Sequence, residues 1–102
     1  MKHKEEFIHA LNLLLTDEPF KAIFNMESWK SCLFGYYNYT YATMPAYKIF
    51  STSVKEYFEL NVDDAYNIFV GDEGDNPTNA EYHVNRVLTY IKEHNLWSIK
   101  KN

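Results

Sequence analysis

Apolar side chains recur every three or four residues along the first part of the chain, a spacing that places them on one face of an α-helix. The first such stretch runs from Glu5 to Leu15. Pro19 then ends or redirects the helix, because proline cannot donate a backbone hydrogen bond. A short helix or a turn is predicted between Phe20 and Trp29. The apolar face of the first helix is formed by Phe7, Ile8, Leu11, Leu14 and Leu15.

The segment from Cys32 to Ala42 has two interpretations. It is almost continuously apolar or aromatic, and the alternation of tyrosine with polar residues over residues 37 to 41 is also typical of a strand. A lone strand would leave its backbone hydrogen-bonding groups unpaired, and no second convincing strand is present in the sequence to pair with it. We therefore predict a helix, with a strand over residues 36 to 41 as the alternative.

Two further helices are predicted between residues 45 and 69. The later one covers residues 60 to 69, with Asn61 as its N-cap. Asp63 and Asp64 would lie in its first turn, where the helix dipole favours negative charge. The apolar face of the earlier helix is formed by Tyr47, Phe50, Val54, Tyr57 and Phe58.

The last helix has the clearest start. Residues 71 to 77 are rich in Gly, Asp, Asn and Pro, which is typical of a loop. Thr78 and Glu81 then have the spacing of a capping box, in which two side chains satisfy free backbone N–H groups. Trp97 and Ile99 follow this helix and are expected to fold back onto the protein. The buried face of the helix is predicted to contain Ala80, Val84, Val87, Leu88 and Ile91.

Composition agrees with one folded domain. The chain has 102 residues, of which 46% are hydrophobic and 18% aromatic, unlike a disordered segment. We predict an all-α fold in which residues 1 to 102 form a single compact domain of four to five helices. Cys32 is the single cysteine, so no internal disulfide can form. The charged N-terminal residues do not resemble a signal peptide, and no apolar run approaches a membrane span. A cytoplasmic location without a membrane partner is expected.

Negative charge is concentrated in one part of the sequence. Between Glu56 and Glu81 there are eight acidic residues and no Lys or Arg, whereas the formal net charge of the whole chain is −4. Such a run is usually a solvated surface, and acids in first helical turns are stabilising there. The alternative is a docking face that attracts a basic protein partner. The residues assigned to that candidate face are Glu59, Asp63, Asp64, Asp72, Glu73 and Asp75.

No arrangement of residues in the sequence indicates a particular catalytic chemistry. The four histidines are not spaced as metal ligands, so no metal site and no cofactor is predicted. A glycine-rich phosphate loop and a nucleophile elbow are both missing. Cys32 in an aromatic helix is most simply a small buried apolar residue, although His83 could approach it in space. Direct nucleic-acid binding is disfavoured, because ten Lys and Arg are scattered among fourteen acids.

Several short segments resemble a family of small bacterial and phage proteins of unknown function. Residues 24–29 (FNMESW) and 32–35 (CLFG) are similar to its F-[DN]-M-x-x-W segment and the C-[IL]-x-G helix that follows. Residues 60–69 resemble its L-x-L-T-x-x-E-A-x-x-L-F stretch, and residues 78–81 its T-P-E-E-A helix start. Family members often have a second cysteine in a C-G-T segment, which this chain lacks. The resemblance implies a helical fold and no activity. The matching motif residues, expected to be structural, are Phe24, Met26, Trp29, Cys32, Gly35, Leu60, Ala65 and Phe69.

Three functional hypotheses follow from these observations. The first is a non-enzymatic protein-interaction module that acts through the acidic face; if the gene comes from a phage, it would inhibit or modulate a host protein, with nucleic-acid mimicry as one form. Abundant tyrosine supports it, since tyrosine is enriched at interfaces. The second is a small enzyme that uses Cys32 or His83 in a tyrosine-lined pocket. The third is a homo-oligomeric structural protein that self-associates through its aromatic residues.

Overall fold

The computed structural model describes residues 2–28, 30–41, 57–70 and 76–98. These residues form helices and contain no strand, so the predicted all-α fold is confirmed and the strand alternative for residues 36–41 is wrong. The radius of gyration is 12.7 Å, as expected for a compact domain of this length. The helices are α1 (Lys2–Leu14), α2 (Glu18–Ile23), α3 (Leu33–Tyr41), α6 (Val62–Phe69) and α7 (Ala80–Glu93), and a 3₁₀ turn, η1 (Leu96–Ser98), follows α7.

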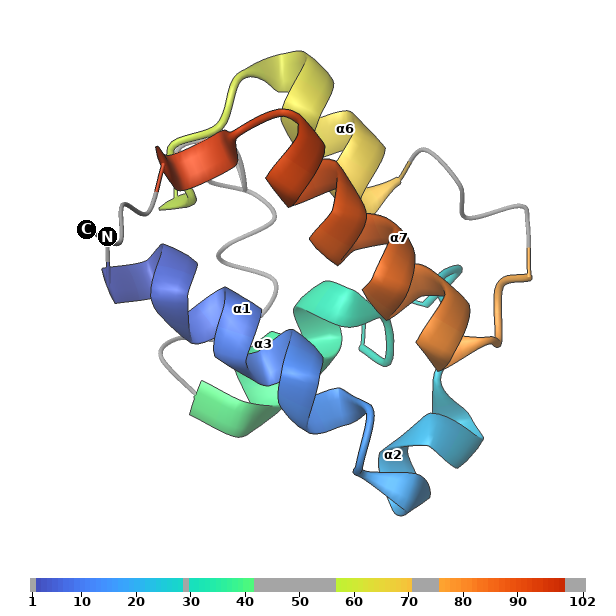
Figure 1. The fold of residues 1–102 in the computed structure, drawn as a ribbon. Coiled ribbons are helices and arrows are strands. Elements are labelled where there is room, and N and C mark those ends of the chain that lie inside the picture. The colour runs from blue at the N-terminus through green and yellow to red at the C-terminus, as the bar shows by residue number, and fades with distance from the viewer. Residues whose placement is uncertain (1, 29, 42–56, 71–75, 99–102) are drawn as a thin grey trace.

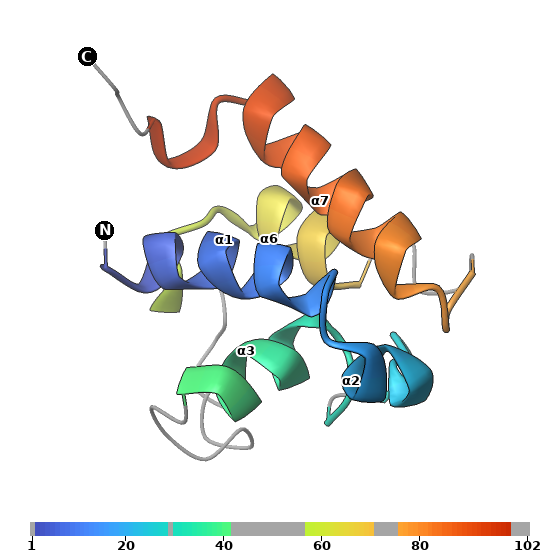
Figure 2. The ribbon, with the colours of Figure 1, turned by 60° about the horizontal axis from the view of Figure 1, so that its bottom comes forward.

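Helix α1 is the central element of the described structure. It lies between α3 on one side and α7 on the other (Figures 1 and 2). Helix α6 runs beside α7, while the short α2 follows the C-terminal end of α1 (Figure 1). This position explains why α1 has a broad apolar face, because it packs on two neighbours. Its buried residues include Phe7, Ala10, Leu11 and Leu14.

Aromatic rings from separate segments meet in the core. Phe58 is fully buried, and the centre of its ring lies 5.2 Å from that of Phe7 and 5.7 Å from that of Phe69. The rings of Tyr37 and Phe58 are 5.3 Å apart. Trp97 folds back as predicted, and its indole Nε1 donates a hydrogen bond of 2.9 Å to the carbonyl of Phe58. Residues distant in sequence thus pack together around Phe58.

The predicted N-cap is correct for α6 and wrong for α7. Asn61 caps α6 as predicted, since its side chain accepts a hydrogen bond of 2.7 Å from the backbone N–H of Asp64. The predicted capping box of Thr78 and Glu81 at the start of α7 is wrong. The N-cap is Asn79, whose side chain accepts a hydrogen bond of 3.0 Å from the backbone N–H of Tyr82. Asparagine is a stronger N-cap than threonine. The helix therefore begins one residue later, and Glu81 no longer has the spacing that would close a capping box.

Some predicted features lie outside the described residues. The predicted helix that ends at Phe58 is among them, apart from Tyr57 and Phe58 themselves. Trp29, Ile99 and residues 71 to 75 of the predicted loop also lie outside.

Two buried tyrosine hydroxyls bind carboxylates. The Tyr36 hydroxyl donates to Asp17 at 2.9 Å, and burial together with this hydrogen bond raises the pKa of Tyr36 to about 12. The Tyr37 hydroxyl donates to Glu6 at 3.2 Å and lies 3.1 Å from the hydroxyl of Tyr57. Burial is the largest cause of the raised pKa of Tyr37, followed by the Tyr57 contact. Both hydroxyls therefore favour the protonated form in the folded state.

This arrangement predicts a loss of stability in alkali. An unfolded tyrosine ionises near pH 10. The stabilisation from Tyr36 and Tyr37 is therefore complete below about pH 10 and is lost as the pH rises toward the folded pKa values. We expect the free energy of unfolding, measured with urea, to fall between about pH 10 and about pH 12. In Tyr37→Phe, which has no hydroxyl to ionise at this position, the fall should be smaller. An equal fall in Tyr37→Phe and the original protein would contradict this assignment.

Candidate protein-interaction surface

Helix α6 has apolar residues on two opposite sides. On its inner side Ile68 is fully buried, and Phe69 packs against the core. On its outer side Val62, Tyr66 and Val70 follow one another at intervals of four residues, which aligns them on the helix surface. Their exposed fractions are 63%, 57% and 40%. Single exposed apolar residues are common, but an aligned row of three marks a surface that another molecule can cover.

Asp63 lies beside this apolar row. Its position one residue after Val62 and three before Tyr66 places it on the edge of the row that faces Asn67. The side chain is exposed and forms no ion pair with a described residue. Its negative charge is therefore presented to solvent next to apolar side chains. We call the surface formed by Val62, Asp63, Tyr66 and Val70 the α6 face.

Asp64 points instead toward α7. Its carboxylate accepts a hydrogen bond of 2.7 Å from the hydroxyl of Tyr90. This hydrogen bond is the largest cause of the raised pKa of Tyr90, followed by burial. Tyr90 also accepts from the side-chain amide of Asn67 at 3.3 Å. The first turn of α6 is thus fastened to α7 through one tyrosine hydroxyl.

The last turn of α6 is fastened to α7 by Arg86. Its guanidinium donates to the carbonyls of Asn67 at 2.5 Å and Ile68 at 3.2 Å, where the end of the helix dipole attracts positive charge. Its Nε–H also donates to Nδ1 of the fully buried His83 at 3.3 Å. Since the other ring nitrogen of His83 lies 3.0 Å from the carbonyl of Asn76, the ring must carry its proton on Nε2 and is neutral. Arg86 and Tyr90 thus bind the two ends of α6 to α7.

An open groove of about 550 Å³ runs along α7. Two of its lining residues, Arg86 and Tyr90, also bind α6, so the groove borders that helix. The α6 face and the groove therefore belong to one region of the surface, formed by two helices. The residues that line the groove are Tyr82, Asn85, Arg86, Thr89, Tyr90 and Glu93.

Two other acids of the segment, Glu59 and Glu81, lie among the described residues, and both pair with lysines of other helices. Glu59 forms an ion pair with the buried Lys4 of α1. The hydrogen bond from Lys4 is the largest cause of the lowered pKa of Glu59. Asp72, Glu73 and Asp75 lie outside the described residues. Of the six acids assigned to the candidate face, Asp63 and Asp64 are therefore the ones that the structure places together on α6.

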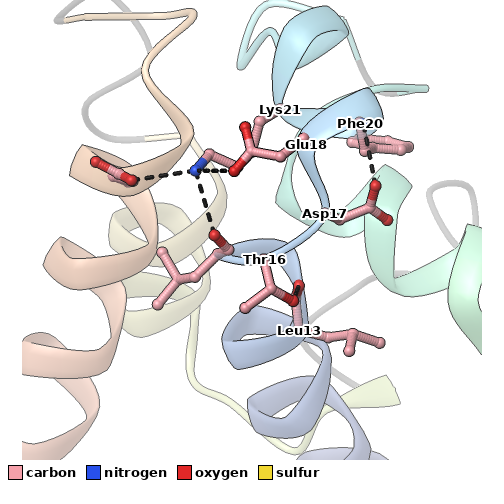
Figure 3. Close-up of polar contacts among 8 residues, drawn as sticks. Leu13, Thr16, Asp17, Glu18, Phe20 and Lys21 are labelled. Atoms are coloured by element: carbon pink, nitrogen blue, oxygen red, sulfur yellow. Dashed lines mark hydrogen bonds and ion pairs between the residues drawn. The ribbon is translucent and has the colours of Figure 1, made fainter.

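Glu81 is also paired with a lysine. The ammonium of Lys21 lies 3.1 Å from Glu81 and 3.4 Å from Glu18, and donates to the carbonyl of Leu15 at 3.2 Å (Figure 3). Lys21 thereby joins the chain after α1, helix α2 and the first turn of α7. The hydrogen bond to Glu81 is the largest cause of the raised pKa of Lys21. Glu81 thus contributes to the joining of helices.

The residues of the enzyme hypothesis lie in the core. Cys32 is buried, and neither Cys32 nor His83 lines the groove on α7. His83 uses both ring nitrogens in the hydrogen bonds to Asn76 and Arg86. Among the residues with assigned positions, no three His, Cys, Asp or Glu side chains are grouped as metal ligands.

The family-motif residues of the described segments are mostly internal. Phe24, Met26, Cys32, Gly35 and Leu60 are buried. Ala65 and Phe69 are partly buried and pack against the core. Trp29 lies outside the described residues. These positions are those of packing residues and not of a surface site.

The exposed apolar row on α6 was missed by the sequence analysis. The signal was available, because residues 62 to 70 contain apolar side chains on two sides of a helix, and only one side can face a core of this kind.

Comparison with known proteins adds no relative. The sequence matches no protein-family profile, no curated protein and no solved structure. None of the described helices is long and apolar enough to cross a bilayer. Any functional inference therefore rests on the surface itself.

Proposed function

We propose that this protein is a cytoplasmic, non-enzymatic interaction module that binds a basic protein partner through the α6 face. The observation that carries the proposal is the exposed row of Val62, Tyr66 and Val70 with the Asp63 carboxylate at its edge. Covering apolar area supplies affinity, and the adjacent negative charge selects a partner with positive charge. Tyr66 is the expected anchor, because tyrosine is among the residues that dominate binding energy at interfaces.

The surroundings of Cys32 and His83 support this function over the enzyme hypothesis. A nucleophile or a general base must reach a substrate, whereas Cys32 is buried and His83 is fully enclosed and hydrogen-bonded. Inhibition of a host nucleic-acid-binding protein by a phage-encoded protein is one form that this interaction would take, with the exposed carboxylate of Asp63 in place of a phosphate.

The proposal is tested by capture from a lysate of the source organism at low and high salt. The double variant Asp63→Lys, Tyr66→Ala should retain at least about tenfold less of the proteins that the original protein captures. An anchor and a complementary charge are removed together in this variant. Retention should also fall with salt, since exposed charges are screened.

Matched control variants are available elsewhere on the surface. Glu27→Lys reverses an exposed charge outside α6, and Tyr39→Ala removes a tyrosine of α3 that is 69% exposed. Both should retain the captured proteins. Equal capture by the double variant and the controls, or no specific capture by any of them, would contradict the proposed function.

A further inference from the structure

If the proposed function holds, the α6 face also indicates what kind of partner segment it binds. We infer that the segment bound by the α6 face is an amphipathic α-helix with an apolar stripe and lysine or arginine along one edge. It would lie along α6 and border the groove on α7.

The shape of the row favours a helix. Val62, Tyr66 and Val70 form a ridge of residues four apart, and such a ridge packs into the groove between matching ridges of a second helix. The row spans about 12 Å, at about 1.5 Å per residue, which corresponds to two to three turns of a partner. Docking of an extended peptide would need an open strand edge, and the described segments contain no strand.

The charges around the row favour a basic edge. Asp63 is exposed beside the row, Asp64 lies in the same helical turn, and Glu93 lines the groove on α7. Arg86, which lines the same groove, is directed at the carbonyls that end α6. A helix whose apolar stripe covers Tyr66 would bring its flanking side chains to these carboxylates. Lysine or arginine there would be stabilised, and acidic residues would be repelled.

A second copy of the chain fits this surface less well. In a symmetric dimer the same patch meets itself. Pairing of two α6 faces would therefore bring the two Asp63 carboxylates into one apolar interface. Burying like charges in this way is costly. An anionic lipid surface is disfavoured for a similar reason, because it attracts basic and not acidic residues.

The test uses three synthetic helical peptides of equal length and the full protein. The first has leucines at positions i, i+3, i+4 and i+7 with lysines beside them. The second keeps the leucines and has glutamates in place of the lysines. The third is the first peptide with a central proline, which breaks the helix. Binding is measured by titration, and the site is mapped from the backbone amide shifts of the protein.

The first peptide should bind at least about tenfold more tightly than the other two. Its shift changes should fall on residues 62 to 70 and on the lining of the α7 groove. Asp63→Lys should weaken its binding about tenfold and reduce the salt dependence, whereas Glu27→Lys should leave both unchanged. Tyr66→Ala should weaken binding by a similar factor.

Three results of the peptide titrations would overturn the inference. These are equal binding of the three peptides, shift changes outside α6 and α7, and no binding up to about 1 mM. Concentration-dependent shifts of the α6 face without peptide would also overturn it, because a second copy would then be the occupant. If the peptides do not bind as expected but the lysate capture depends on Asp63 and Tyr66, the inference of a helical partner is wrong and the proposed function stands. If capture is also insensitive to both residues, the proposed function fails with it.

Discussion

Replacing Phe58 by alanine is expected to destabilise the protein by about 3–5 kcal/mol, the usual cost of removing a buried aromatic ring. Phe58 is fully buried and its ring contacts Phe7, Phe69 and Tyr37. These neighbours come from α1, α6 and α3, so the cavity would open where three helices meet. A loss of this size is a large part of the stability of a small domain.

The effect is measured by urea unfolding followed by circular dichroism. Phe58→Leu should lose less of the free energy of unfolding than Phe58→Ala, because leucine leaves a smaller cavity. Tyr39→Ala, which removes an exposed ring, should change the free energy of unfolding by no more than about 0.5 kcal/mol. If Phe58→Ala were as stable as Tyr39→Ala, Phe58 would not lie at the centre of the core.

Replacing Arg86 by methionine is expected to cost about 2–3 kcal/mol and to loosen α6 specifically. Methionine keeps an unbranched stem of similar length but cannot donate hydrogen bonds. The carbonyls of Asn67 and Ile68 and the Nδ1 atom of His83 would all lose a donor. A hydrogen bond from a charged group is worth about 1.5–3 kcal/mol. The expected loss is smaller than the sum of three such bonds, because the bond to the Asn67 carbonyl is exposed and water can replace it. Arg86→Lys should recover only part of the loss, because a single ammonium cannot reproduce the forked geometry.

Hydrogen exchange separates this effect from general instability. In Arg86→Met the amides of α6 should exchange faster, while those of α1 change less. Lys92→Met removes an exposed cation from the same helix and is the matched control, with an expected change within about 0.5 kcal/mol. Equal protection of α6 in Arg86→Met and Lys92→Met would show that Arg86 does not hold α6 in place.

The sequence predicts much of the helical structure, because local signals determine it. The apolar spacing located α1 and α7, and Asn61 was correctly identified as the cap of α6. Residues 36 to 41 were correctly assigned to a helix from the absence of a pairing strand. The start of α7 was assigned to the wrong residue. Thr78 and Asn79 are adjacent and both residue types can cap a helix, and the stronger cap, asparagine, is the one used.

The sequence does not show which charges of the candidate face are available, because contacts between residues distant in sequence decide it. Glu59 pairs with Lys4 across 55 residues and Glu81 with Lys21 across 60. A count of charges along the chain cannot reveal such pairs. The outward direction of Tyr66 likewise depends on which side of α6 the core occupies. The sequence thus shows that acids are concentrated in one segment, but it does not show which of them face solvent unpaired.

The shortness of α6 has a consequence for recognition. A helix of eight residues is not stable alone in water. Its outer row of side chains therefore depends on the contacts of α6 with the rest of the protein, which are the burial of Ile68 and the hydrogen bonds to Arg86 and Tyr90. A peptide copied from residues 61 to 70 will not compete for the partner. A bound partner, in turn, will slow the unwinding of this helix and raise the melting temperature of the whole protein by mass action.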